Sequence, residues 1–119
     1  MMAEGFAPVM RDYQKHILVC TGLKCAGENG ANLYQWMKER LRELGLHEGI
    51  ARINRSQCHC FGVCEGGPLA VVYPEGIWYH HLNTEKMERI IQEHLLRNKP
   101  VKEYIFHRVG GAVSKGEVD

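Results

Sequence analysis

The chain has 119 residues, a formal net charge of +1 and 45% hydrophobic residues, which is ordinary for one globular domain. It lacks the basic excess that neutralises nucleic-acid phosphates and the roughly 20 consecutive apolar residues that cross a bilayer. Because residues 1–14 lack the features of a secretory signal, we expect a cytoplasmic protein. Structural disulfides are rare in that compartment, so the five cysteines indicate metal or redox chemistry.

The first part of the chain predicts a strand followed by a helix. The run 15–20 (KHILVC) is rich in β-branched and aliphatic side chains, which is typical of a buried strand. After a glycine-bearing loop, apolar residues at helical spacing predict a helix over 31–44, with Gly45 as its left-handed cap. The apolar stripe of this helix consists of Leu33, Met37, Leu41 and Leu44.

The middle of the chain predicts a second strand, a cysteine-rich loop and a hairpin. Alternation of apolar and polar residues in 50–54 (IARIN) predicts the strand, which the loop 55–68 follows. Residues 69–73 (LAVVY) and 77–81 (IWYHH) are typical of the two strands of a hairpin around a Pro-Glu-Gly turn.

The last third predicts one helix and one extended segment. Asn83 or Thr84 can cap the helix, and 98–100 (NKP) end it. The segment 101–109 (VKEYIFHRV) is a candidate addition to a sheet edge. We expect the buried face of the helix to consist of Met87, Ile90, Ile91, His94 and Leu95.

Together these elements predict an α/β domain. A strand–helix–strand unit favours a right-handed parallel crossover, and a hairpin adds antiparallel strands to the same sheet. The expected architecture is a mixed four-stranded sheet, in the chain order β-α-β-β-β-α, with helices packed on it. We expect this domain to occupy 15–109, between a flexible arm at 1–14 and a flexible tail at 110–119.

The cysteines fall into two groups, each at the end of a predicted strand. Cys20 and Cys25 follow the first strand, and Cys58, Cys60 and Cys64 follow the second. Parallel strands end at the same edge of a sheet, so the two loops should emerge side by side and their thiolates can converge on one centre. The spacings C-x4-C and C-x3-C fit the cysteine ligation of an iron–sulfur cluster.

Alternatives remain open on the residues alone. A structural Zn²⁺ ion accepts similar spacings of four cysteines and would make the chain an interaction module. Cys58 lies two residues before Cys60, so either could be the third ligand. We favour Cys60 because the Cys60–Cys64 loop is compact, which leaves Cys58 as a buried small residue or a spare thiol. His59 could replace a thiolate, although we expect an exposed loop residue there.

The sequence around these cysteines resembles the thioredoxin-like [2Fe–2S] ferredoxin family. The resemblance rests on the C-x4-C pair, on 60–68 (CFGVCEGGP) and on 71–79 (VVYPEGIWY), and it extends over about 15–96. It implies a thioredoxin-like fold and a [2Fe–2S] cluster. The Gln57-Cys58-His59 segment departs from the family pattern, which leaves the roles of Cys58 and His59 open. The ligands that the resemblance implies are Cys20, Cys25, Cys60 and Cys64.

The resemblance also implies a function. It indicates a one-electron carrier rather than an enzyme, working with redox partner proteins on its own or as a subunit of an oxidoreductase, and it is compatible with a homodimer. A carrier or sensor that delivers a labile cluster is the alternative within iron–sulfur chemistry. An X–Pro bond is trans by default, which is the expectation for Gly67–Pro68, while the thioredoxin-like resemblance raises the cis alternative.

Overall fold

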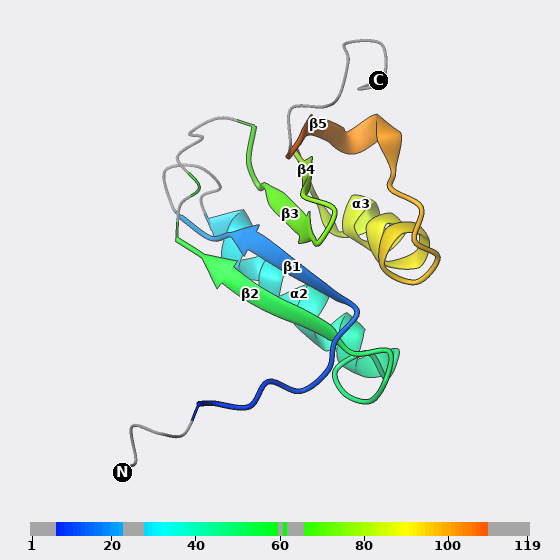
Figure 1. Cartoon of the computed structure of the whole chain (residues 1–119). Coiled ribbons are helices and arrows are strands. Elements are labelled where there is room, and N and C mark those ends of the chain that lie inside the picture. Colours follow the sequence, from blue (N-terminus) through cyan, green and yellow to red (C-terminus); the bar gives the residue numbers. More distant parts are fainter. Residues whose placement is uncertain (1–6, 23–27, 60, 62–65, 110–119) are drawn as a thin grey trace.

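The computed structural model describes residues 7–22, 28–59, 61 and 66–109. Within them the chain forms a five-stranded sheet with the strand order β2-β1-β3-β4-β5 (Figure 1). Residues 7–14 precede the sheet as exposed chain outside any helix or strand, while the predicted tail at 110–119 lies outside the described residues. The strands are β1 (Lys15–Cys20), β2 (Ile53–Cys58), β3 (Ala70–Tyr73), β4 (Ile77–Tyr79) and β5 (Ile105–Arg108).

The predicted mixed topology is confirmed. Helix α2 (Glu28–Glu43) connects β1 to β2, and these two strands pair in parallel. β3 pairs antiparallel with β1, and β4 pairs antiparallel with β3 as the second strand of a hairpin. The predicted number of four strands was wrong, because β5 pairs antiparallel with β4 and adds a fifth strand at the edge.

The position of β2 also differs from the prediction. The alternation in 50–54 placed the strand too early, since Ile50 is 87% exposed in a turn and β2 runs through the polar segment that was assigned to a loop. β2 lies at the edge of the sheet beside β1, where backbone pairing stabilises a strand that has few apolar side chains. In consequence Cys58 is the last residue of β2 instead of a loop residue.

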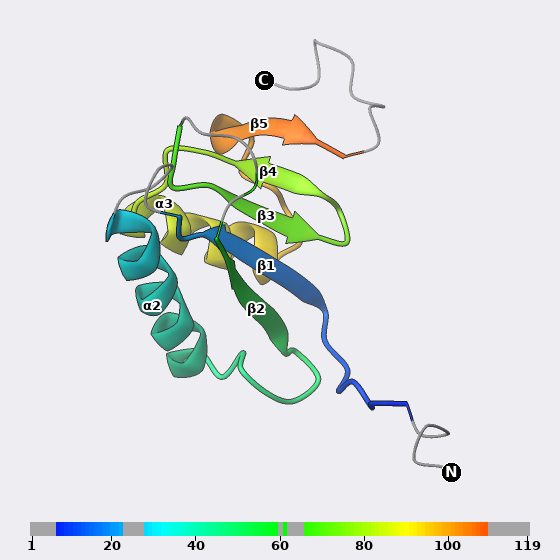
Figure 2. The same ribbon diagram turned by 90° about the vertical axis from the view of Figure 1, so that its left-hand side faces the viewer.

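Helices α2 and α3 (Thr84–Arg89) cover one face of the sheet (Figures 1 and 2). Helix α3 continues as a π-helical turn over Ile90–Leu95. A row of strand residues in register points to this face and is buried: Ile17, Val72 and Ile77. The predicted face of the last helix, Met87, Ile90, Ile91, His94 and Leu95, is buried against them, as are Leu33, Met37 and Leu41 of α2. The opposite face carries the register row Leu18, Val71, Trp78 and His107.

The ends of both helices follow from the sequence. Gly45 adopts a φ of +73° just after α2, a conformation that costs glycine little. At the start of α3 the Asn83 side-chain oxygen accepts the backbone N–H of Lys86 at 2.8 Å, which confirms the predicted N-cap.

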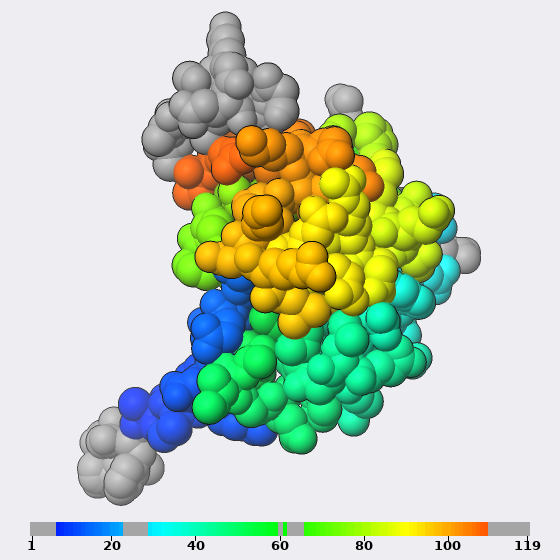
Figure 3. Space-filling view, turned by 90° about the vertical axis from the view of Figure 1, so that its right-hand side faces the viewer, coloured from blue at the N-terminus to red at the C-terminus, as the bar shows by residue number. Residues whose placement is uncertain are grey.

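In Figure 3, α3 and the segment after it (yellow and orange) form one surface with the end of α2 and the turn that follows (teal to green).

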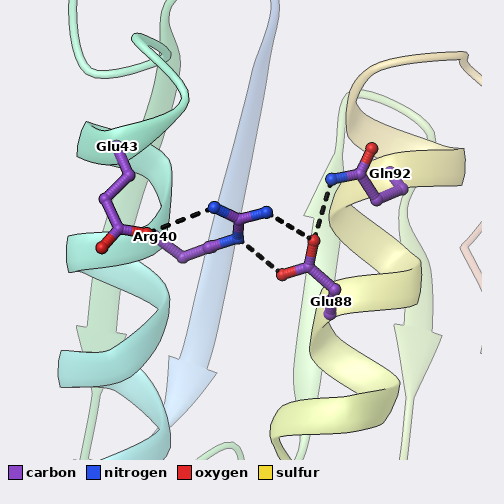
Figure 4. A network of polar contacts seen from close by, with 4 residues as sticks. All are labelled: Arg40, Glu43, Glu88 and Gln92. Carbon is purple, nitrogen blue, oxygen red and sulfur yellow. Dashed lines mark hydrogen bonds and ion pairs between the residues drawn. The ribbon is translucent and has the colours of Figure 1, made fainter.

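A polar network joins α2 to α3 (Figure 4). The Arg40 guanidinium donates to both carboxylate oxygens of Glu88, through Nε at 2.8 Å and Nη2 at 3.0 Å, and its Nη1 donates to Glu43 at 3.2 Å. Gln92 Nε2 donates to the same Glu88 carboxylate at 2.8 Å. The hydrogen bonds from Arg40 lower the pKa of Glu88. The two side chains therefore form an ion pair at neutral pH, and this pair links α2 to α3.

A second network is buried between the sheet and the last helix. His94 has no exposed surface, and its Nδ1 lies 2.7 Å from the hydroxyl oxygen of Tyr79. That hydroxyl accepts the backbone N–H of Val101 at 3.1 Å, so its own proton is available for His94 Nδ1. His94 Nε2 then faces the Glu75 carboxylate at 3.6 Å, and Glu75 pairs with Lys15. Burial lowers the pKa of His94 to about 4, more than the nearby Glu75 raises it.

This network predicts a pH-dependent free energy of unfolding. Because the unfolded chain binds the His94 proton near pH 6.5 and the folded chain only near pH 4, stability is unchanged by this group above pH 6.5 and falls as the pH drops below it. The slope from one proton is at most about 1.4 kcal/mol per pH unit. We expect His94→Gln to remove this contribution to the pH dependence of the free energy of unfolding, measured by denaturant titrations between pH 7.5 and 5. An equal pH dependence in both proteins would contradict the role given to His94.

Candidate cluster-binding site

The ends of β1 and β2 lie side by side, as the parallel crossover predicted. Cys20 and Cys58 are register partners at the last position of each strand, so their side chains leave the same face of the sheet. The Thr21 backbone N–H donates to the Cys58 carbonyl oxygen at 2.8 Å and extends this pairing one residue beyond β1. On the other side, the Cys20 N–H donates to the Leu69 carbonyl oxygen at 2.9 Å. Both cysteine-bearing loops therefore start from fixed and adjacent backbone.

Gly22 and His59 are where the two loops touch. A Cβ atom built on Gly22 would lie 2.0 Å from the carbonyl oxygen of His59, closer than any side chain tolerates. Only glycine lets the backbone after β1 approach the backbone after β2 in this way. The contact lies within the C-x4-C segment on one side and immediately before Cys60 on the other.

The predicted ligands divide between described and undescribed residues. Cys20 is fully buried, with its Sγ 3.9 Å from the His59 carbonyl oxygen. Cys25, Cys60 and Cys64 lie outside the described residues. Among the described residues no group of three or more histidine, cysteine or acidic side chains gathers as a metal site. Of the five cysteines, the structure describes Cys20 and Cys58.

The two residues that the sequence left ambiguous are both described. His59 is exposed, which confirms the expectation of an exposed loop residue. Cys58 is half-buried, so the prediction of a buried small residue was only partly right. Its place at the end of an edge strand explains the remaining exposure, because β1 covers one side of β2.

The second loop returns to the sheet through a hydrogen-bonded segment. The Gly66 carbonyl oxygen accepts the N–H of His81 at 2.7 Å, and the Pro68 carbonyl oxygen accepts the N–H of Leu82 at 3.1 Å. The Gly67–Pro68 bond is cis, so the default expectation of a trans bond was wrong. These contacts attach the end of the loop to the residues that lead from β4 into α3.

Phe61 and Trp78 form a contact whose importance sequence reasoning missed. Phe61 lies between Cys60 and Cys64, and its ring meets the Trp78 ring edge-on with centroids 5.0 Å apart. In the sequence, Trp78 is only one residue of the predicted hairpin strand 77–81. The motif 71–79 contained the residue, but only the structure shows that its ring contacts Phe61.

This arrangement fits an iron–sulfur cluster. Thiolate sulfur is the ligand that such clusters use, and the buried Cys20 lies at the start of the first loop. The approach at Gly22, which a Cβ would block, brings the two cysteine-bearing segments together. Residues 9–95 match the family model of thioredoxin-like [2Fe–2S] ferredoxins. The chain belongs to this family.

Individual relatives agree with this membership. The chain is 30% identical over 92 residues to "Ferredoxin, 2Fe-2S" of Clostridium pasteurianum, covering 73% of this chain and 90% of that protein. A protein of the same name from Aquifex aeolicus is 26% identical over 105 residues, covering 79% of this chain and 90% of that protein. The structure of a thioredoxin-like [2Fe–2S] ferredoxin from Aquifex aeolicus matches with a TM-score of 0.71 at 24% identity, over 82% of this chain and 94% of that one, which shows the thioredoxin-like fold.

Family membership settles the class of the protein. The chain is a [2Fe–2S] ferredoxin, an electron carrier and not an enzyme, which confirms the expectation drawn from the cysteine motifs. No helix in the described part of the chain has the length and apolar character that a membrane span requires. The cofactor is a [2Fe–2S] cluster, as predicted.

Proposed function

We propose that Cys20, Cys25, Cys60 and Cys64 hold the cluster and that this ferredoxin carries one electron between redox partner proteins in the cytoplasm. The observation that carries the proposal is the meeting of the two loops at Gly22 and His59. It brings the backbone of the C-x4-C segment against that of the residue before the C-x3-C segment. Four thiolates from two adjoining loops are the donor set that a [2Fe–2S] cluster requires.

The described residues prepare this edge of the sheet for electron transfer. When bound, the cluster supplies a centre that accepts and releases one electron. The backbone of Cys20 is fixed by the hydrogen bond of its N–H to Leu69 and by its pairing with Cys58, and the residue is fully buried. Exposed His59 places the start of the second loop at the surface, within reach of a docked partner. Electron-transfer contacts of this kind are small, below roughly 1,200 Å².

The unit that performs this function is proposed as residues 15–109. β1 supplies the first loop, and β5 ends the sheet at Arg108. The core lies between the sheet and the helices and draws on every element from β1 to β5. Residues 7–14 lie exposed before this unit.

A redox titration tests the proposed electron transfer. We expect anaerobically purified protein to be reduced and reoxidised reversibly as a one-electron couple, followed by visible absorbance and electron paramagnetic resonance, with iron and sulfide content unchanged after the cycle. Loss of the cluster on reduction, or its transfer to an apo acceptor protein during the cycle, would instead identify a cluster carrier or sensor.

A further inference from the structure

Trp78 lies on the sheet face that α2 and α3 do not cover. Its register partners are Val71 on β3 and His107 on β5, on the face opposite the helices. Its half-buried ring meets the ring of Phe61 at 5.0 Å, and the rings of Phe106 and His107 at 6.3 Å each. Trp78 thereby contacts Phe61, the described residue between Cys60 and Cys64 in the sequence.

The indole N–H of Trp78 adds a second observation. Its Nε1 atom is buried, and it has no hydrogen-bond partner among the residues that the structure describes. A buried donor without an acceptor costs about 1–3 kcal/mol, so such groups are rarely left unsatisfied. The ring that carries this donor packs on Phe61, which lies between Cys60 and Cys64 in the sequence, and the sulfurs of cysteines and of a bound cluster are hydrogen-bond acceptors.

We propose that Trp78 is a positioning residue for the cluster, which packs on Phe61 to hold the Cys60–Cys64 loop and donates its indole N–H to sulfur at the cluster. The edge-on contact holds the Phe61 ring against Trp78 of β4. The N–H donor stabilises the reduced cluster more than the oxidised one, because reduction adds negative charge to the sulfurs. Trp78 therefore raises the reduction potential. This inference rests on the proposed cluster ligation.

Two substitutions separate the two roles. Trp78→Phe keeps an aromatic ring against Phe61 and removes the N–H, so we expect a lower reduction potential with normal cluster content. Trp78→Leu removes the ring as well, and we expect roughly two- to tenfold faster release of iron to a chelator, the range that an aromatic pair supports. Phe61→Leu should accelerate the release of iron similarly. The variant that combines Trp78→Leu with Phe61→Leu should release iron no faster than Trp78→Leu alone.

Trp36→Phe is the matched control, since Trp36 is the other tryptophan of the chain and packs against the core from α2. We expect its potential and iron-release rate to equal those of the unaltered protein. Fluorescence gives a separate readout: Trp78 emission in the Trp36→Phe protein should be quenched by the cluster more strongly than Trp36 emission in Trp78→Phe.

The outcomes are distinguishable from failure of the proposed function. If the unaltered protein binds no cluster, the ligand proposal is wrong. If it binds the cluster and Trp78→Phe has the same potential as Trp36→Phe, the role of Trp78 is overturned while the ligand proposal stands. A lower potential in Trp78→Phe, with normal cluster content, supports it even if Trp78→Leu fails to fold.

Discussion

Replacement of Cys60 by alanine is expected to abolish the cluster, whereas replacement of Cys58 leaves it largely intact. The reason lies in the spacing within the second group of cysteines. Cys58 is the last residue of β2 and stands outside the compact Cys60–Cys64 loop. Cys60 begins the compact C-x3-C loop, which can bring two thiolates to one metal centre.

The measurement is the visible absorbance and the iron content per chain after anaerobic purification, with both variants purified in parallel. The half-buried Cys58 stands beside Cys20 in register, so it is the one described cysteine that could compete for the metal. Equal loss of colour in the two variants would show that our choice of the third ligand is wrong. Cys20→Ala should match Cys60→Ala, since Cys20 is the buried donor at the end of β1.

The second large effect is expected from Gly22→Ala. The added methyl group would lie 2.0 Å from the His59 carbonyl oxygen, so one of the two loops must shift. The obstacle is backbone, which cannot rotate away as a flexible side chain can. Overpacking costs about 1–3 kcal/mol, and here it separates the two proposed ligand pairs. We expect most of the cluster to be lost, measured as iron and sulfide per chain.

Gly49→Ala is the control for this variant. Gly49 adopts a φ of +85°, and a Cβ atom there would meet no atom within 4 Å. Alanine at this position strains the backbone by roughly 1 kcal/mol without touching a neighbour. It should therefore lower the free energy of unfolding and leave the cluster content normal. Normal cluster content in Gly22→Ala would contradict the role assigned to the loop contact.

Much of the fold was readable from side-chain patterns. The strand 15–20, the apolar stripe of α2 and the buried face of the last helix were predicted because each element buries a regular row of apolar residues. β2 was misplaced because an edge strand with the sequence INRSQC is stabilised by backbone pairing with β1, which leaves no apolar pattern. β5 was recognised only as a candidate for the same reason, since it is a short strand at the opposite edge.

The site was predictable in its chemistry and less so in its geometry. Cysteine spacing and the glycine-rich run 60–68 indicated an iron–sulfur centre, because the two ligands of each pair lie close together in the sequence. The approach of Gly22 to His59 and the contact of Phe61 with Trp78 join residues far apart in the chain. Such contacts depend on strand register, which the sequence pattern around Cys58 did not give correctly.

The central claim is that this chain binds one [2Fe–2S] cluster through cysteine thiolates. The most direct test is an ultraviolet–visible spectrum of anaerobically purified protein, with iron, sulfide and zinc quantified on the same sample. Our account predicts a red-brown protein with about two irons and two sulfides per chain and no zinc. A colourless protein that contains one zinc ion and no sulfide would contradict it.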